Sequence, residues 1–263
     1  MKSQFTGAGP QPAIAAKMLR LKAKNFRASP LVEAWRNITD QKKVPIAGFQ
    51  FEVDKSVMNA RVRSQVYRGV YEMSKFVIAD ALMRPGDRVL ELGAGLGLVT
   101  VLAASRCGRD AVVSFEAVPR NADLIRRNLA LNNVSADVRA RAIGHVDGTI
   151  DFFVAADAIS SSTNTVRGDT GMTKITVPCD NIQVVMAQVR PNVLLIDVEG
   201  TETDIVPLID LSEVRAIMIQ IHGDVVDDTT ASNIMRTFLA AGLQHLHMCS
   251  IGNIWAFERP EAR

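Results

Sequence analysis

Hydrophobic residues change their spacing near residue 88, and this change divides the chain into two patterns. Before it, apolar positions recur every three or four residues over Pro12–Phe26, Leu31–Asn37 and Arg61–Met83, which predicts three helices. Ile46–Val53 predicts a hairpin or an edge strand between them. A polar break at Thr39–Lys43 separates the first two helices from all that follows. The sequence therefore predicts a helical N-terminal appendage that is set apart from a larger domain.

After residue 88, short apolar runs alternate with stretches of helical periodicity. The apolar runs predict strands over Arg88–Leu92, Ala111–Glu116, Ala136–Ile143, Gly148–Ala155, Thr173–Pro178, Asn192–Asp197, Val214–Ile221, Gln244–Cys249 and Asn253–Glu258. The helices predicted between them are Gly95–Ser105, Pro119–Leu131, Thr201–Ile209 and Asp228–Ala241. Strands that are apolar throughout and alternate with helices favour a parallel sheet with helices on both faces.

The end of the chain refines this fold class. The last two predicted strands are joined by Ser250-Ile251-Gly252, so they form a closing hairpin. In such a hairpin the last strand runs antiparallel within an otherwise parallel sheet. Rossmann-like methyltransferase domains end in this way, whereas ordinary dinucleotide-binding domains do not. A polar loop, Asp157–Gly171, is long enough to cover a site. The sequence thus predicts an α/β fold with a Rossmann-like, mostly parallel sheet.

The composition is that of a globular protein, with 48% hydrophobic and 22% charged residues among 263. This excludes the disordered, collagen-like and disulfide-scaffold classes. The net charge of +2 is unevenly distributed. Residues 1–45 hold nine Lys and Arg against Glu33 and Asp40, so this segment carries +7 and residues 46–263 carry −5. We therefore predict a basic helical appendage over 1–45 and one domain over 46–263.

The basic residues of the appendage are best interpreted as a solvated helix face. Lys17, Arg20 and Lys24 form one stripe at helical spacing, and no aromatic side chains lie among them to stack on bases. We therefore expect no nucleic-acid partner. The sequence leaves open whether a homo-oligomer forms through this appendage.

Two observations concern the compartment. No apolar run approaches the roughly 18 residues that span a bilayer, and the N-terminal residues lack the apolar segment of a secretory signal. Cys107, Cys179 and Cys249 show no C-x-x-C spacing and are interpreted as reduced thiols. We therefore expect a cytoplasmic protein without a transmembrane segment.

The first chemical signal is a glycine-rich turn, Glu91-Leu-Gly93-Ala-Gly95-Leu-Gly97, between a predicted strand and a predicted helix. Glycine lets the backbone approach a ligand closely as the chain turns into the helix. A leucine stands where the dinucleotide fingerprint has Gly or Ala, and Glu91 would repel a pyrophosphate but suits the ammonium group of S-adenosylmethionine. Glu116, at the end of the next strand, is placed to accept both ribose hydroxyl hydrogens. These features favour S-adenosylmethionine as the ligand.

The second signal is the segment Leu194-Leu-Ile-Asp197-Val-Glu199-Gly-Thr-Glu202, at the carboxyl end of a predicted strand. Ligands of open α/β sheets bind outside these strand ends. Asp197 and Glu199 share one strand face, so they could deprotonate an acceptor hydroxyl or hold a divalent ion. We favour the metal-free version, because no further cluster of oxygen ligands is evident nearby. Glu202 could equally stabilise the first turn of the next helix, and His222 ends the next strand as a candidate base.

Four segments, in this order, resemble the FkbM family of S-adenosylmethionine-dependent methyltransferases: VLELGAGLGLVT, VVSFEAVPRNADLIRRNL, AIGHVDGTIDFF and VLLIDVEGTETDIV. The resemblance covers about residues 46–258, and its most specific element is LIDVEGTE. It implies a seven-stranded methyltransferase fold with S-adenosylmethionine as cofactor. It also implies methylation of a hydroxyl group on a small molecule, usually a sugar or a secondary metabolite.

The resemblance also implies roles for particular residues. By matching position, those that hold the cofactor are Tyr71, Glu72, Glu91, Gly93, Gly95, Gly97, Glu116, Ala142, Ile143 and Asp197. Asp197, Glu199 and His222 are the implied catalytic residues, and Glu199, Glu202 and His222 are the implied acceptor-binding residues. Leu195 replaces the usual Lys of the family motif, and Gln220 stands where the family often has Glu.

Other functions are compatible with parts of this sequence. A nicotinamide-dependent oxidoreductase could use the same glycine turn, but the missing second mononucleotide half counts against it. Two further alternatives stay open: methyl transfer to nitrogen by a protein of the same fold, and a non-catalytic binding module. A low aromatic content of 5% offers little surface for stacking a flat substrate, and the polar loop suits a hydroxylated one. We therefore expect a hydroxylated metabolite or glycoside as the acceptor.

Overall fold

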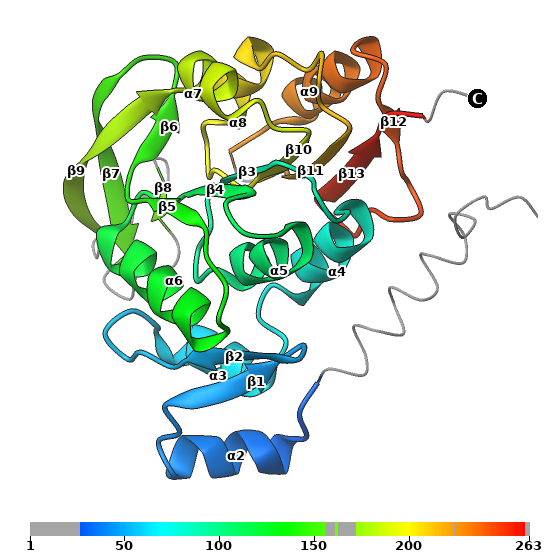
Figure 1. Cartoon of the computed structure of the whole chain (residues 1–263). Coiled ribbons are helices and arrows are strands. Elements are labelled where there is room, and N and C mark those ends of the chain that lie inside the picture. Colours follow the sequence, from blue (N-terminus) through cyan, green and yellow to red (C-terminus); the bar gives the residue numbers. More distant parts are fainter. Residues whose placement is uncertain (1–26, 156–160, 163–171, 224, 261–263) are drawn as a thin grey trace, which may run out of the picture.

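The computed structural model describes residues 27–155, 161–162, 172–223 and 225–260. The predicted helix Pro12–Phe26 and most of the predicted loop Asp157–Gly171 lie outside these residues. The rest of the chain forms a central sheet between layers of helices, with a smaller N-terminal portion on one side (Figure 1).

In the described ranges, a seven-stranded sheet forms the centre of the molecule (Figure 1). Its strands in spatial order are β12 (Gln244–His245), β13 (Ile254–Glu258), β11 (Ala216–Gln220), β10 (Val193–Ile196), β3 (Val89–Leu92), β4 (Val112–Phe115) and β5 (Asp137–Arg139). The strands from β11 to β5 run parallel, whereas β13 is antiparallel to both of its neighbours. The predicted α/β class with a mixed sheet is confirmed. The chain order reverses between β3 and β10, where such sheets form a ligand crevice.

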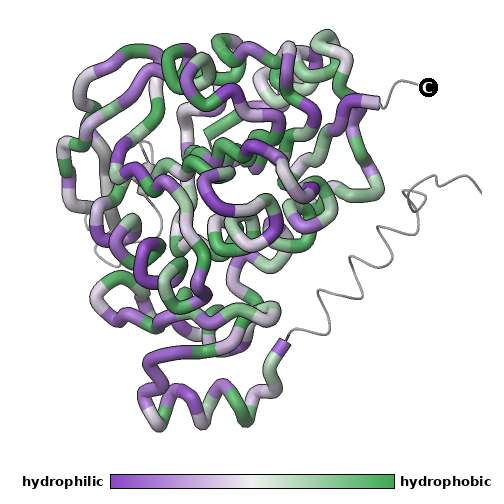
Figure 2. The backbone as a smooth tube through the Cα atoms, viewed as in Figure 1, coloured by the Kyte–Doolittle hydropathy of each residue, from purple (hydrophilic) through white to green (hydrophobic). Residues whose placement is uncertain are grey.

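Helices cover both faces of this sheet (Figure 1). On one face lie α4 (Met73–Leu82), α5 (Leu98–Cys107) and α6 (Pro119–Leu131), and on the other α7 (Ile182–Val189), α8 (Glu202–Ile205) with a 3₁₀ turn (Val206–Leu208), and α9 (Asp228–Ala240). Side chains alternate along a strand, so Leu195 packs on the α4–α6 side and Leu194 on the α7–α9 side. The central strands therefore contribute side chains to both cores, and β10 is apolar throughout. Figure 2 shows these hydrophobic stretches through the centre of the molecule.

A second sheet lies beside β5, and it corrects one prediction. Its strands in spatial order are β6 (Ala142–Gly144), β9 (Met172–Asn181), β7 (Gly148–Ala155) and β8 (Ser161–Ser162). The single predicted strand Ala136–Ile143 is wrong, because the chain leaves the main sheet after β5 and enters the second sheet at β6. The backbone turns between them, where the Arg141 N–H donates to the Arg139 carbonyl oxygen at 2.9 Å. Apolar and charged residues alternate without interruption from residue 136 to residue 142, so the sequence pattern does not mark this change of sheet.

The N-terminal portion comprises α2 (Pro30–Ile38), the hairpin of β1 (Lys43–Ile46) and β2 (Phe49–Glu52), and α3 (Ala60–Tyr67). The predicted hairpin is confirmed, and its turn uses Ala47 and Gly48, both with positive φ. The Arg36 side chain on α2 donates to the Tyr67 carbonyl oxygen on α3. The domain division at residue 45 stays a prediction.

The single helix predicted over Arg61–Met83 is wrong, because the chain leaves the helical conformation between α3 and α4. Gly69 and Glu72 adopt φ of 66° and 47°. A positive φ is rare for a residue other than glycine, so tertiary contacts rather than local preference hold Glu72 in this conformation. The break turns Tyr71 and Glu72 toward the glycine turn that follows β3.

Three smaller observations complete the fold. The predicted strand Gln244–Cys249 is shorter than expected, because β12 ends at His245 and turns follow it. Within the described ranges, no helix has the length and apolar character needed to cross a membrane. Cys107, Cys179 and Cys249 are buried free thiols.

Candidate active site

A cavity of about 520 Å³ opens at the carboxyl ends of the parallel strands. The predicted site residues that line it are Tyr71, Glu72, Gly93, Gly95, Glu116, Ala142, Ile143, Asp197, Glu199 and His222. Glu91, Gly97 and Glu202 were also predicted but do not line the cavity. The structure thus brings most of the predicted site together and places these three residues behind the cavity wall.

The three glycines of the turn after β3 all have positive φ, between 57° and 84°. A Cβ atom on Gly93 would lie 1.9 Å from the Asp197 carbonyl oxygen, so this residue lets the turn fit against the end of β10. On Gly95 it would lie 3.1 Å from the Tyr71 hydroxyl oxygen, and on Gly97 it would lie 2.9 Å from an isoleucine side chain on α6. Gly93 and Gly95 therefore shape the cavity, whereas Gly97 serves helix packing.

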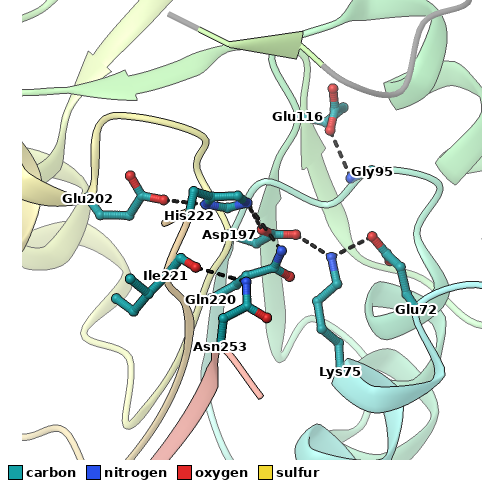
Figure 3. A network of polar contacts seen from close by, with 10 residues as sticks. All are labelled: Glu72, Lys75, Gly95, Glu116, Asp197, Glu202, Gln220, Ile221, His222 and Asn253. Carbon is teal, nitrogen blue, oxygen red and sulfur yellow. Dashed lines mark hydrogen bonds and ion pairs between the residues drawn. The ribbon is translucent and has the colours of Figure 1, made fainter. Parts of the chain in front are cut away.

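Glu116 follows β4, and its buried carboxylate forms part of the cavity wall. Its Oε2 accepts a hydrogen bond from the Gly95 N–H at 2.9 Å (Figure 3). Its Oε1 accepts from the Val118 N–H at 3.0 Å and from the Asn121 amide at 3.2 Å. Burial raises the pKa of Glu116 to about 7, although these hydrogen bonds oppose the rise. The carboxylate is fixed in place and retains acceptor capacity for further donors.

Glu91 lies inside the molecule, beneath the glycine turn. Its Oε2 accepts hydrogen bonds from the hydroxyl groups of Thr100 at 2.6 Å and Ser114 at 2.7 Å. Burial raises the pKa of Glu91 to about 7, against the effect of these two hydrogen bonds. Direct contact with a cofactor ammonium group does not fit this position, and Glu91 instead ties β3 to α5 and β4.

Lys75 on α4 joins two carboxylates on the cavity wall (Figure 3). Its Nζ lies 2.5 Å from Glu72 Oε1 and also contacts Asp197 Oδ2. Burial alone would lower the pKa of Lys75, but the two carboxylates outweigh this effect and raise it. Burial also raises the pKa of Glu72, and Lys75 partly offsets that rise. Asp197 is therefore one side of a buried ion pair.

His222 follows β11 and is held from both sides (Figure 3). Its Nδ1 lies 2.6 Å from Glu202 Oε1, while Glu202 Oε2 accepts from the Gly200 N–H at 2.9 Å. Its Nε2 lies 3.4 Å from Asp197 Oδ1 and 3.2 Å from the Gln220 amide nitrogen. Burial lowers the pKa of His222, but the bond to Glu202 and the nearby carboxylate charges raise it above its ordinary value. A histidine whose Nδ1 contacts a carboxylate and whose Nε2 lies near a cavity has the arrangement of a general base.

Among the cavity residues that the sequence reasoning missed, two make contacts that shape the site. Lys75 lay inside an apparently continuous helix, where a lysine is normally exposed, and only its spacing of three residues from Glu72 gave a signal. Asn253 precedes β13, and its side chain donates to the Ile221 carbonyl oxygen at 2.8 Å. This contact fixes the turn beside His222 and joins residues more than thirty positions apart, so no local pattern could reveal it.

The described ranges contain no group of three or more His, Cys, Asp or Glu side chains placed to hold a metal ion. Asp197 instead pairs with Lys75, and Glu202 with His222. The metal-assisted alternative therefore lacks a ligand set in this part of the chain.

Comparisons with known proteins can now be set beside this geometry. The family model described as the methyltransferase FkbM domain matches residues 91–245. Ribosomal protein L11 methyltransferase from Symbiobacterium thermophilum is 36% identical over 77 residues, which are 29% of this chain and 25% of that protein. A protein of the same name from Thermosipho africanus is 32% identical over 74 residues, 28% of each chain. The matches thus span only about a quarter of the length of these relatives.

Solved structures give more distant similarities. Ribosomal protein L11 methylase from Lactobacillus delbrueckii subsp. bulgaricus has a TM-score of 0.42 and 10% identity, over 73% of this chain and 80% of that chain. Precorrin-6y C5,15-methyltransferase from Geobacter metallireducens has a TM-score of 0.44 and 12% identity, over 79% and 95%. Because the family model matches more than half of its residues, the chain belongs to the FkbM methyltransferase family.

Proposed function

We propose that this protein transfers the methyl group of S-adenosylmethionine to a hydroxyl oxygen of a small molecule, such as a sugar or a secondary metabolite. When bound, S-adenosylmethionine supplies a methyl group activated by the charge on its sulfur. The protein then has to align donor and acceptor and to remove one proton from the acceptor.

The cavity residues fit this cofactor. A volume of about 520 Å³ lies within the range of small-molecule sites. Glu116 would accept the ribose hydroxyl hydrogens, and Ala142 and Ile143 would flank the adenine ring. Gly95 leaves open the space that a side chain would fill. The buried Tyr71 hydroxyl lies beside this space, so it can contact a ligand that passes over Gly95.

One observation carries the proposal: His222 lines the cavity, and its buried partner Glu202 lies behind the cavity wall. With the Nδ1 proton donated to Glu202 at 2.6 Å, Nε2 is the unprotonated nitrogen. The Gln220 amide nitrogen lies 3.2 Å from Nε2, and the acceptor hydroxyl would take its place as the donor to this lone pair. The acceptor proton goes to Nε2, and the resulting imidazolium lies between Glu202 and Asp197. Because Lys75 already pairs with Asp197, His222 is the base and Asp197 stabilises it.

Amide side chains near His222 favour a hydroxylated acceptor. Gln220 and Asn253 line the cavity, together with Glu199 and Thr201. Amides both donate to and accept from hydroxyl groups, and they suit a polyhydroxylated molecule better than a flat aromatic one. An amine acceptor needs less help from a base, so the His222–Glu202 pair favours transfer to oxygen. The proposal also includes three points that rest on the sequence: a cytoplasmic location, no nucleic-acid partner and self-association through residues 1–45.

The experiment is methyl transfer from isotope-labelled S-adenosylmethionine to a panel of glycosides and other hydroxylated metabolites. We expect a product that gains one methyl group on oxygen, located by mass spectrometry. Dialysis against a chelator should leave the rate unchanged. A product methylated on nitrogen would contradict transfer to oxygen, and a rate that is lost on chelation and restored by magnesium would contradict the metal-free mechanism.

A further inference from the structure

Lys75 is a buried cation, and the removal of a proton by His222 gives it no role. It is 8% exposed, and its Nζ contacts Glu72 Oε1 at 2.5 Å and Asp197 Oδ2. Two carboxylates and one ammonium group leave this cluster with a net charge of −1. All three residues line the cavity, so the charge faces any ligand bound there. A buried ionic cluster is costly to desolvate, which points to a use beyond stability.

The cluster lies at one end of the cofactor wall. Figure 3 shows Gly95 between Glu116 and the pair of Glu72 and Lys75. A Cβ atom on Gly95 would lie 3.4 Å from Glu72 Oε1 and 3.1 Å from the Tyr71 hydroxyl oxygen. If Glu116 holds the ribose, a ligand that passes over Gly95 reaches the cluster with its other end.

The backbone at Glu72 supports a ligand-binding role. Glu72 precedes α4 with φ of 47°, and its side chain makes no capping hydrogen bond to that helix. Its carboxylate is instead turned to Lys75. Backbone conformations of this kind persist where surrounding contacts enforce them, and they gather at ligand sites.

We propose that Glu72, Lys75 and Asp197 bind the amino-acid end of the methyl donor, an inference that rests on the cofactor proposed above. Lys75 Nζ receives the carboxylate of the donor, and Glu72 and Asp197 receive its ammonium group. The donor carries an ammonium, a carboxylate and a sulfonium group, so its net charge of +1 complements the −1 of the cluster. Methyl transfer removes the sulfonium charge, so the cluster attracts the product less than the donor.

The test compares two ligands that differ only in the part Lys75 would contact. S-adenosylhomocysteine carries the amino-acid end, and 5′-methylthioadenosine lacks it. In Lys75→Met, calorimetric titration should show S-adenosylhomocysteine affinity weakened about 10- to 100-fold, as expected for a lost charge-assisted hydrogen bond. The affinity for 5′-methylthioadenosine should change less than about twofold.

Two further variants sharpen this comparison. Lys75→Arg keeps the charge and should restore part of the preference for S-adenosylhomocysteine. Lys55→Met is the matched control, because Lys55 is 52% exposed and pairs with Asp40 on the surface, and it should leave both affinities unchanged.

The possible results distinguish failure of this inference from failure of the proposed cofactor. Equal weakening of both ligands would show that Lys75 only supports the structure, and an unchanged affinity for S-adenosylhomocysteine would remove Lys75 from the site. Either result overturns the inference. Failure of the wild-type protein to bind either ligand would overturn the cofactor itself. If Lys75→Met does not fold, Lys75→Gln keeps a donor for both carboxylates, and the same comparison decides.

Discussion

Glu91 and Glu116 show how the surroundings of a side chain set its role. Both are buried carboxylates whose pKa is raised to about 7 by burial. Glu91 is enclosed by hydroxyl groups of its own protein, whereas Glu116 lies on the cavity wall beside Gly95. The sequence places both near the glycine turn, but only the packing of α5 and β4 around Glu91 separates the two functions.

The affinity for S-adenosylhomocysteine should depend on the ionisation of Glu116. Only the ionised carboxylate accepts both ribose hydroxyl hydrogens, and its pKa is about 7. The affinity should therefore fall below about pH 7, by up to roughly tenfold per pH unit. Glu116→Gln should remove this dependence and weaken binding above pH 7 by roughly 1.5 to 3 kcal/mol. Titrations at several pH values test this, and an affinity that is the same in both proteins at every pH would leave Glu116 as a support for Gly95 only.

The contribution of Glu91 to the free energy of unfolding of the ligand-free protein should decrease as pH rises. An ion-paired surface carboxylate contributes more as pH rises. Its folded pKa of about 7 lies above the value of about 4.3 expected in the unfolded chain. Between these values the folded state holds a proton that the unfolded state has released, so the free energy of unfolding falls as pH rises. The full effect of Glu91 is roughly 4 kcal/mol.

Glu91→Gln isolates this contribution, because Glu116 titrates in both proteins. The variant stays neutral and can still accept from Thr100 and Ser114. It should match the wild type at about pH 4, where Glu91 is protonated in both states, and exceed its free energy of unfolding at about pH 8. Urea unfolding at the two pH values measures the difference. A variant that is less stable than the wild type at the higher pH would mean that the Glu91 charge stabilises the fold.

The cavity is assembled by short segments that follow strands, above all the glycine turn after β3. Its three glycines meet three different elements, namely the end of β10, the link before α4, and α6. One turn thereby sets the distances among the residues proposed for the cofactor that follow β3, β4 and β10. Its geometry depends on close backbone approach, which only glycine allows here.

Gly95→Ala should abolish binding of S-adenosylhomocysteine in a folded protein. The new Cβ would lie 3.1 Å from the Tyr71 hydroxyl oxygen and 3.4 Å from Glu72 Oε1, in space left for the ligand. Gly48→Ala is the matched control, because Gly48 also has positive φ but a Cβ there would have no heavy atom within 4 Å. Both variants should lose about 1 kcal/mol of stability from backbone strain. Retained binding in folded Gly95→Ala would mean that this turn does not hold the ligand.

The sequence predicted the central strands of the main sheet well, because burial on both faces makes them largely apolar, whereas the polar edge strands β5 and β12 were predicted with the wrong bounds. It failed where a tertiary contact overrides a local preference. Glu72 leaves the helical region although a helical pattern runs through it, and the switch from β5 to β6 occurs within one apparent strand. The strand-end residues Glu116, Asp197 and His222 were predictable from topology. Lys75 was not, because its partner Asp197 is 122 positions away.

The molecule joins its N-terminal portion to the site through α3. Asn59, Arg61, Val62 and Gln65 on or beside this helix line the cavity, opposite the strand ends. α3 in turn is held by α2, where Ser64 donates to Glu33 and Arg36 donates to the Tyr67 carbonyl oxygen. The N-terminal portion is therefore connected to the cavity through α3.

Deletion of residues 1–40 should leave the binding of S-adenosylhomocysteine intact and raise the KM for the acceptor. Every residue proposed for the cofactor lies beyond the deletion, whereas the loss of α2 removes two side-chain contacts to α3. Gel filtration and titration of the truncated chain check folding and cofactor binding, and acceptor kinetics check the KM. A monodisperse truncated protein that no longer binds S-adenosylhomocysteine would show that this segment is part of the cofactor site.

The sharpest test of the mechanism is the pH dependence of methyl transfer at saturating S-adenosylmethionine. If His222 is the base, the wild-type rate rises with pH as His222 loses its proton, with a midpoint above the ordinary value of about 6.5 because its pKa is raised. Glu202→Gln removes the charge beside Nδ1, so the midpoint should move to lower pH. His222→Gln should lose roughly 100-fold or more in rate while it still binds S-adenosylhomocysteine. A wild-type rate and pH profile in His222→Gln would contradict the assignment of His222 as the base.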